Sequence, residues 1–184
     1  MDTRKGTETG MKNSKGLVAA INWNVIEDET DLIVWNRLVQ NFWVPQKIAV
    51  SDDLPSWHKM TESEKDVTRK IFGGLTMLDT VQGTIGAIEI MKDSITPHEE
   101  AVFSYIAFNE HIHAQSYSSI FATLCSIKEN NEIFRWTDEN DLLIEKQKTI
   151  LGIYDDIEGN PLKKKAASVF LEGFLFYSGF FWPL

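Results

Sequence analysis

The sequence places a carboxylate and an imidazole one helical turn apart, at Glu110 and His113. Side chains three residues apart on a helix project from the same side, so this pair can bind one divalent metal and reach a second. Such Glu-x-x-His units build the dinuclear iron and manganese sites of helical bundles. Tyr117 follows His113 at about 6 Å along the same helix face. A metal pair that activates oxygen could therefore oxidise the phenol placed next to it.

Each of these residues also has a structural interpretation. A single Glu-x-x-His match is more often a pair on a helix surface than a pair of ligands, and a lone tyrosine is more often a core residue with a hydrogen-bonded hydroxyl. His111 cannot share the site, because it lies roughly 200° around the helix from His113. The metal interpretation therefore depends on ligands from other helices.

Two further carboxylates, Asp79 and Glu172, lie within apolar helical stretches. An ionised carboxylate in such surroundings has a high desolvation cost unless a partner or a cation satisfies it. A buried ion pair or a hydrogen bond between helices is the structural alternative, but no lysine or arginine lies in these stretches. Oxygen-rich ligation with imidazole suits iron or manganese. Asp79, Glu110, His113 and Glu172 are therefore candidate metal ligands, and a purely structural cluster stays open as the alternative.

Helices must position these residues, because strand-like alternation is weak throughout the chain. Thr61 and Glu64 form a capping box that opens a long helix, and Thr96–Pro97 opens another. The expected helices cover residues 31–42, 62–91, 97–125, 137–155 and 161 onward. Glycines between positions 73 and 86 indicate close helix contact or a local distortion. Long helices joined by short loops predict an all-α antiparallel bundle.

The composition narrows the classes of protein that remain. Of the 184 residues, 43% are hydrophobic and 24% are charged, as in an ordinary globular domain. The formal net charge of -9 argues against nucleic acid as a partner, since phosphate backbones require clustered Lys and Arg. The one basic run, residues 163–165, is interpreted as a solvated helix face. No apolar stretch approaches the roughly 20 residues needed to cross a bilayer, so no membrane partner is expected.

The N-terminal residues and the single cysteine bear on location. Residues 1–17 lack the apolar core of a signal peptide, and we expect a disordered tail there, followed by one domain over residues 18–184. Cys125 excludes an internal disulfide and fits a reducing compartment, so a cytoplasmic protein is expected. No neighbour activates this thiol in the sequence, which favours a structural role.

At these residues the sequence resembles the class Ib small subunit of ribonucleotide reductase. The resemblance covers about residues 18–184. The stretches that carry it are Ala20–Asn24, Asn41–Pro45, Gly74–Thr80, Glu110–Ser119 and Pro161–Gly179. It implies a ferritin-like helical bundle with a dinuclear manganese or iron centre. Asp79, Glu110 and His113 would be ligands of the first metal, Glu110 would bridge both metals, and Glu172 would bind the second.

The resemblance also implies redox roles and partners. Tyr117 would be oxidised to a stable radical, and Trp43 would lie near the start of the radical-transfer path. The radical would be used by a large catalytic subunit that reduces ribonucleoside diphosphates to deoxyribonucleotides. A homodimer and a flavodoxin-like activator of the manganese form are further partners that the resemblance implies.

The sequence departs from the family pattern at its C-terminal end. A complete site has a second Glu-x-x-His, and none of His58, His98 and His111 has an acidic residue three positions before it. We therefore expect an incomplete bundle, a weak second metal and no stable tyrosyl radical in the isolated chain. The aromatic residues expected to be exposed are Phe174, Phe176, Phe180, Phe181 and Trp182.

Two other functions compete with the reductase interpretation. One is a different ferritin-like di-metal oxidase or metal store, which need not keep Tyr117 and Trp43; the presence of both favours the reductase. The other is a truncated, non-catalytic remnant or an association partner, which the missing ligands support.

Overall fold

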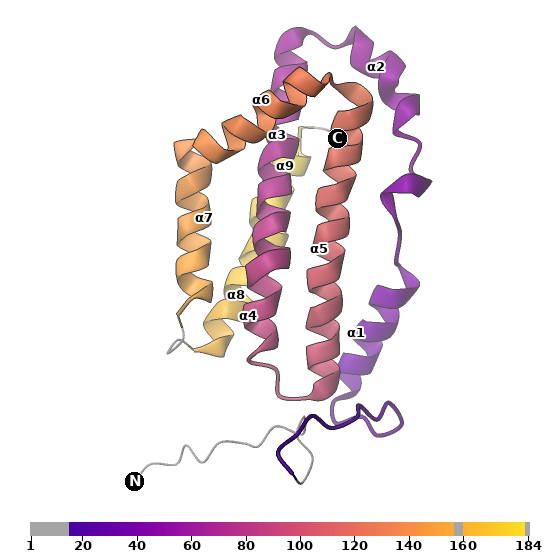
Figure 1. Ribbon diagram of the computed structural model, residues 1–184, viewed down its shortest axis with the longest axis vertical. Coiled ribbons are helices and arrows are strands. Elements are labelled where there is room, and N and C mark those ends of the chain that lie inside the picture. The colour runs from indigo at the N-terminus through magenta and orange to yellow at the C-terminus, as the bar shows by residue number, and fades with distance from the viewer. Residues whose placement is uncertain (1–14, 157–159, 183–184) are drawn as a thin grey trace.

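The computed structural model describes residues 15–156 and 160–182, and Figure 1 shows it as a bundle of helices. Residues 1–14 lie outside the described part, so the predicted disorder of 1–17 stays a prediction. The described residues contain no β-strand, and the all-α prediction is confirmed. Among them, no helix is both long enough and apolar enough to cross a membrane.

Nine α-helices make up most of the described chain. They are α1 (Glu29–Gln40), α2 (Leu54–Lys59), α3 (Glu62–Val81), α4 (Ala87–Met91), α5 (Pro97–Leu124), α6 (Ile127–Glu139), α7 (Asp141–Tyr154), α8 (Pro161–Phe170) and α9 (Phe176–Phe180). Two short 3-10 turns, η1 (Pro45–Lys47) and η2 (Val50–Asp53), connect α1 to α2. Two π-helical segments, η3 (Gln82–Gly86) and η4 (Leu171–Leu175), continue α3 into α4 and α8 into α9.

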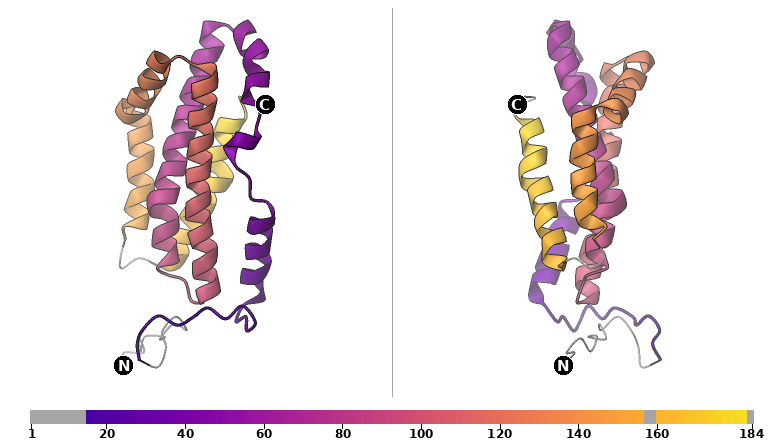
Figure 2. Two further views of the ribbon diagram at one scale, coloured as in Figure 1. Left: turned by 45° about the vertical axis from the view of Figure 1, so that its right-hand side comes forward. Right: turned by 90° about the vertical axis from the view of Figure 1, so that its left-hand side faces the viewer.

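Three long rods form the centre of the bundle. The α3–η3–α4 rod packs against α5 and against the α8–η4–α9 rod, while α1 packs on α5 and α7 packs on α3 and α8. Figures 1 and 2 show that the α3 and α8 rods run in opposite directions, so that α4 lies beside α8 and α9 lies beside α3. This arrangement brings residues from α3, α5 and η4 to one level of the bundle.

The predicted helix starts are confirmed at the level of their capping bonds. The backbone N–H of Glu64 donates to Thr61 Oγ1 over 3.3 Å, and Thr61 N–H donates back to the Glu64 carboxylate over 2.7 Å. Thr96 caps α5 by accepting from the N–H of Glu99 at 2.9 Å. Asn160 caps α8. Each bond satisfies one of the backbone donors that a helix leaves unpaired at its first turn.

The predicted single helix over 137–155 is wrong, because the structure has two helices there. The break falls at Asn140, whose extended backbone ends α6 and whose side chain accepts from the N–H of Leu143 at 3.1 Å to begin α7. The start of α6 carries its own capping box, formed by Ser126 and Glu129. That signal was present in the sequence and places the start of α6 ten residues before the predicted one.

The glycines of the second predicted helix mark both close contact and distortion, as expected. A Cβ on Gly73 would lie 2.7 Å from Ile133 Cγ2, so α3 and α6 approach closely at this point. Gly83 and Gly86 lie within the π segment η3. A π segment inserts an extra residue into the helix, and such segments often occur at functional sites.

Substitution of Gly86 is expected to destabilise the bundle. A Cβ at this position would lie 2.2 Å from Gln82 Oε1 and 2.7 Å from Tyr154 Cε2, and overpacking of this kind costs about 1–3 kcal/mol. Gly86→Ala should therefore lower the midpoint of thermal unfolding. Gly152→Ala is the matched control, because nothing lies within 4 Å of its added Cβ; it should raise the midpoint by removing a helix-interior glycine. A Gly86→Ala chain as stable as the parent would contradict the packing described.

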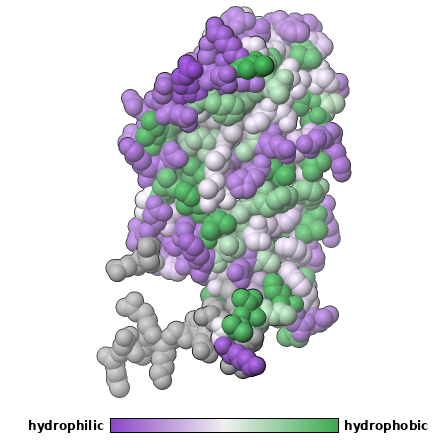
Figure 3. All heavy atoms as spheres, in the orientation of Figure 1, coloured by the Kyte–Doolittle hydropathy of each residue, from purple (hydrophilic) through white to green (hydrophobic). Residues whose placement is uncertain are grey.

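The basic run at 163–165 is not the solvated face that the sequence suggested. Lys164 is only 6% exposed and its Nζ lies 3.0 Å from Asp93 Oδ2, while Lys165 pairs with Glu99. The two ion pairs therefore join α8 to the α4–α5 connection, at Asp93, and to the first turn of α5, at Glu99. Over the face seen in Figure 3, hydrophilic residues are densest at the end of the bundle that carries α6, in keeping with the acidic composition.

The last rod is only partly as exposed as expected. Phe174, Phe181 and Trp182 are exposed, as predicted. Phe176 is buried at 4% exposure and Phe180 is half-buried, because both turn toward α3 and join the core cluster. The rod thus has one face in the core and one apolar face toward solvent.

Candidate metal centre

The structure brings three of the predicted ligands into one cluster. Asp79 lies near the end of α3, and Glu110 and His113 lie in the middle of α5. One ligand atom from each of the three lies within 4.8 Å of the others. Asp79 and Glu110 are 3% and 5% exposed, so two carboxylates are buried together. Burial of like charges at this separation is unfavourable unless protons or a cation neutralise them.

His113 is oriented by hydrogen bonds at both ring nitrogens. Its Nδ1 lies 3.0 Å from Glu110 Oε2, and its Nε2 lies 3.0 Å from Asn109 Nδ2. Because a carboxylate only accepts, Nδ1 carries the proton and donates, while Nε2 accepts from the amide. Burial lowers the pKa of His113, but the hydrogen bond and charge of Glu110, with the charge of Glu172, outweigh it and raise the pKa.

The carboxyl groups of Asp79 and Glu172 respond strongly to their surroundings. Burial, reinforced by the charges of Glu110 and Glu172, raises the pKa of Asp79 to about 9. Burial and the charge of Glu110 raise the pKa of Glu172 to about 7. Asp79 Oδ2 and Glu172 Oε1 are buried without a hydrogen-bond partner. Two such orphaned oxygens at one site need an explanation, and a bound cation supplies one.

A cavity of about 480 Å³ lies beside the cluster. Its lining combines three predicted ligands with an aromatic wall from the last rod: Asp79, His113, Glu172, Phe176, Tyr177, Phe180 and Phe181. Carboxylate oxygens with one imidazole form a donor set that suits manganese or iron. The residues present therefore fit a metal site in both chemistry and burial.

Tyr117 lies next to this cluster on α5. Its ring is half-buried and packs against Phe72 with ring centroids 5.5 Å apart. Burial, together with the carboxylates of Asp79 and Glu110, raises the pKa of the phenol above its usual value. The phenol is therefore neutral at physiological pH, close to the carboxylates that would hold a metal.

Trp43 lies against the imidazole of His113. The two rings are stacked, with centroids 5.9 Å apart and planes 20° from parallel. Without the family resemblance, Trp43 is one of six tryptophans and nothing in its spacing singles it out. The structure thus places an aromatic residue from the segment after α1 directly beside a candidate ligand.

Comparison with known proteins decides the family. Residues 20–184 match the family described as "Ribonucleotide reductase, small chain". The chain belongs to this family. The small-chain match covers every candidate ligand, together with Trp43 and Tyr117.

The relatives of this small chain share its sequence over most of its length. The ribonucleoside-diphosphate reductase subunit beta of Mycobacterium leprae is 54% identical over 176 residues, which is 96% of this chain and 54% of the relative. The ribonucleoside-diphosphate reductase 2 subunit beta of Escherichia coli is 53% identical over 91% of this chain and 52% of its own length. The chain thus spans about half the length of the curated relatives it matches.

A solved structure confirms the fold of the small chain. The crystal structure of dimanganese(II)-NrdF from Streptococcus sanguinis superposes with a TM-score of 0.87 at 52% identity, covering 90% of this chain and 58% of that one. The ferritin-like fold is therefore confirmed. The match covers a little more than half of the neighbour's chain.

Two contacts shape the candidate site: the glycines were predicted to mark a close helix contact, though not one with Glu110, and Asn109 was missed. Gly83 allows η3 to approach α5, since a Cβ there would lie 2.9 Å from Glu110 Cβ. Asn109 orients the imidazole of His113 from one turn earlier on α5. The helical spacing of Asn109 and His113 was the signal available in the sequence. His111, which the helix geometry excluded, is exposed.

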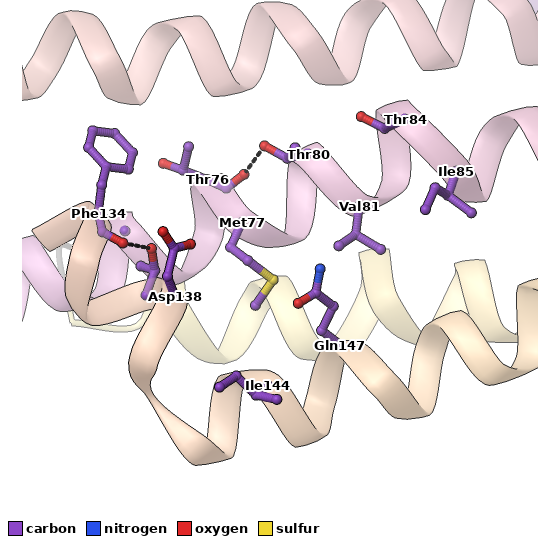
Figure 4. A pocket seen from close by; sticks show the side chains of 12 residues that line it. Thr76, Met77, Thr80, Val81, Thr84, Ile85, Phe134, Asp138, Ile144 and Gln147 are labelled. Carbon is purple, nitrogen blue, oxygen red and sulfur yellow. Dashed lines mark hydrogen bonds between the residues drawn. The ribbon is translucent and has the colours of Figure 1, made fainter.

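A second cavity of about 380 Å³ contains none of the candidate ligands (Figure 4). It lies between α3, α6 and α7. Thr76, Thr80, Met77 and Gln147 contribute to its wall. The hydroxyls of Thr76 and Thr80 each donate to a backbone carbonyl one turn earlier at 2.7 Å, so they are already satisfied. The candidate ligands Asp79, His113 and Glu172 line only the first of these two cavities.

Proposed function

We propose that this chain forms part of the small subunit of a ribonucleoside-diphosphate reductase and holds a dinuclear manganese or iron centre that generates a radical on Tyr117. The observation that carries the proposal is the buried cluster of Asp79, Glu110 and His113, with Tyr117 beside it on α5. The name of the Streptococcus neighbour, a dimanganese(II) protein, supports manganese, and iron is the alternative.

Four side chains of this chain would hold the metals: Asp79, Glu110, His113 and Glu172. When bound, the metal pair would supply, with oxygen as the oxidant, the oxidising power that removes one electron from a phenol. A ligand atom must be deprotonated to bind, so the Asp79 carboxyl would release its proton and the proton of the neutral His113 ring would move from Nδ1 to Nε2. Both groups hold protons in the metal-free protein because they lie among buried carboxylates.

Tyr117 would supply the electron. Its raised pKa keeps the phenol protonated, so oxidation must remove a proton together with the electron. The neighbouring carboxylates of Asp79 and Glu110 favour the neutral phenol and thereby disfavour simple ionisation. Packing against Phe72 limits access of water to the ring, which would protect a radical from quenching.

Trp43 and the partners complete the proposal. The stacking of Trp43 on His113 supports a role for Trp43 in passing an electron between the metal centre and the segment after α1. The electron would come from a large catalytic subunit that reduces ribonucleoside diphosphates to deoxyribonucleotides. A homodimer, a flavodoxin-like activator of the manganese form and a cytoplasmic location belong to the same proposal.

The role of Tyr117 is testable in a fusion of this chain to the part of the Streptococcus NrdF that it does not cover. After loading with Fe(II) and oxygen, electron paramagnetic resonance (EPR) should show a tyrosyl radical. Tyr117→Phe should abolish the signal and leave the bound iron unchanged. Tyr105→Phe, on the same helix, should leave the signal intact. A radical signal that survives in Tyr117→Phe, or an iron-loaded parent fusion without a signal, would refute the proposal.

A further inference from the structure

A buried hydrogen-bonded chain joins α7, η3 and α8 about one helical turn from the candidate ligands. Tyr154, at the end of α7, donates its hydroxyl proton to Gln82 Oε1 over 2.8 Å. Gln82, the first residue of η3, donates from Nε2 to Ser168 Oγ on α8, also over 2.8 Å. Tyr154 and Gln82 are 0% and 1% exposed. The proposed radical chemistry uses none of these three residues.

The surrounding backbone accommodates this chain of bonds closely. A buried amide costs free energy unless its donor and acceptor are paired, and both ends of Gln82 are paired. Gly86 leaves the space in which Gln82 meets Tyr154, since a Cβ there would lie 2.2 Å from Gln82 Oε1. The contact therefore depends on a specific small residue and on the π segment that contains it.

The position of Gln82 along its rod relates it to the metal site. Gln82 follows Asp79 by one helical turn, and Ser168 precedes Glu172 by one turn. The two rods run antiparallel in Figures 1 and 2. The Gln82–Ser168 bond therefore lies one turn from the level at which Asp79 and Glu172 face the same cavity. A slip of one rod along the other would break this bond and separate the two carboxylates.

Directional contacts between these rods are few. In the described part of the chain, the Gln82–Ser168 and Trp182–Thr68 bonds are the side-chain hydrogen bonds that join the last rod to α3–η3. Most of the remaining interface is apolar, and apolar contact is non-directional, so it tolerates sliding better than a hydrogen bond does. The buried amide is thus suited to fix the register.

We propose that Gln82, held by Tyr154 and Ser168, is a positioning residue that fixes the register of α8–η4 against α3 and so sets Glu172 opposite Asp79 for metal binding. The inference rests on the proposed metal centre and deepens it. Residues that orient metal ligands from outside the coordination sphere typically change metal affinity 10–100-fold when they are substituted. An effect of about 10-fold is expected here.

The test is an anaerobic Mn²⁺ titration of the full chain, with unbound Mn²⁺ measured by its EPR signal. Ser168→Ala and Gln82→Met each remove the interhelical bond with little change in size, and each should weaken Mn²⁺ binding about 10-fold. Ser168→Thr keeps the hydroxyl and should bind within about twofold of the parent. The Gln82→Met/Ser168→Ala double variant should lose no more affinity than Gln82→Met alone, because the bond that Ser168→Ala removes is already absent from Gln82→Met.

Thr137→Val is the control for general destabilisation. It removes a buried hydroxyl on α6 that bonds to the carbonyl of Phe134 and is not in the lining of the cavity beside Asp79 and Glu172, and it should leave Mn²⁺ affinity unchanged. If Gln82→Met and Ser168→Ala both fold and bind Mn²⁺ as tightly as the parent, the positioning role is wrong. The proposed metal centre would not be contradicted by that result. If Gln82→Met does not fold, Ser168→Ala decides, since alanine favours the helix. A parent chain that binds no Mn²⁺ overturns the proposed function and this inference together.

Discussion

Glu110→Gln is expected to weaken Mn²⁺ binding by at least about 100-fold, beyond the range of a residue outside the coordination sphere. Glu110 is the carboxylate that contacts His113 Nδ1 and raises the pKa of Asp79, so it lies at the centre of the cluster. Glutamine preserves its size but removes the charge that a metal ligand at this position would supply. If the amide N–H₂ group of the glutamine faced His113 Nδ1–H, two donors would meet. The substitution would then weaken the orientation of His113 as well as removing the charge.

The measurement is the same anaerobic Mn²⁺ titration, with circular dichroism to verify that the helices remain. His111→Gln is the matched control, because His111 lies next to Glu110 on α5 but is exposed. This control should bind Mn²⁺ as the parent does. Equal affinity of the parent and Glu110→Gln would place the metal elsewhere and remove the basis for the Asp79–Glu110–His113 site.

Asp79→Asn is expected to stabilise the metal-free chain at pH 8 by several kcal/mol while destroying metal binding. The pKa of Asp79 is about 9 in the folded chain against 3.8 for an ordinary aspartate, chiefly because of burial. The folded state therefore retains a proton that the unfolded state releases. Stability is complete below about pH 4 and falls as the pH rises toward 9. Asparagine is neutral at every pH and avoids this loss.

The comparison requires thermal unfolding of both metal-free chains between pH 5 and pH 9. The advantage of Asp79→Asn should be small at pH 5 and grow with pH. Glu172, with a pKa of about 7 against 4.5, adds a second decline that both chains share below pH 7. If the unfolding midpoints of the two chains changed with pH in the same way, the raised pKa of Asp79 would be contradicted. Stability sacrificed at a functional site is a common trade-off in enzymes.

The candidate ligands could be predicted from the sequence because their residue types are unusual at their positions. Asp79 and Glu172 stand in apolar helical stretches, and Glu110 and His113 have the spacing of one helical turn. The long α5 helix was predictable from the Thr96 cap, which the structure confirms. These signals are local. Helix geometry alone determines which residues share one side of a helix.

The remaining features depend on tertiary contacts that no local pattern encodes. Lys164 looks like a solvated lysine until α8 docks and brings it against Asp93. Gln82 looks like an ordinary helix residue until α7 and α8 supply its two partners. The π segment η3 likewise contains Gly83 and Gly86, whose close neighbours include Glu110 on α5 and Tyr154 on α7, far away in the sequence.

A crystal of this chain soaked in Mn²⁺ and measured at the manganese absorption edge gives the most direct test of the metal centre. We expect an anomalous peak among the carboxylates of Asp79 and Glu110 and the Nδ1 atom of His113, on the side facing Glu172. The same peak should be absent from Glu110→Gln crystals. A Mn²⁺-bound crystal whose anomalous peaks all lie away from these side chains would contradict the proposal that the cluster holds a metal.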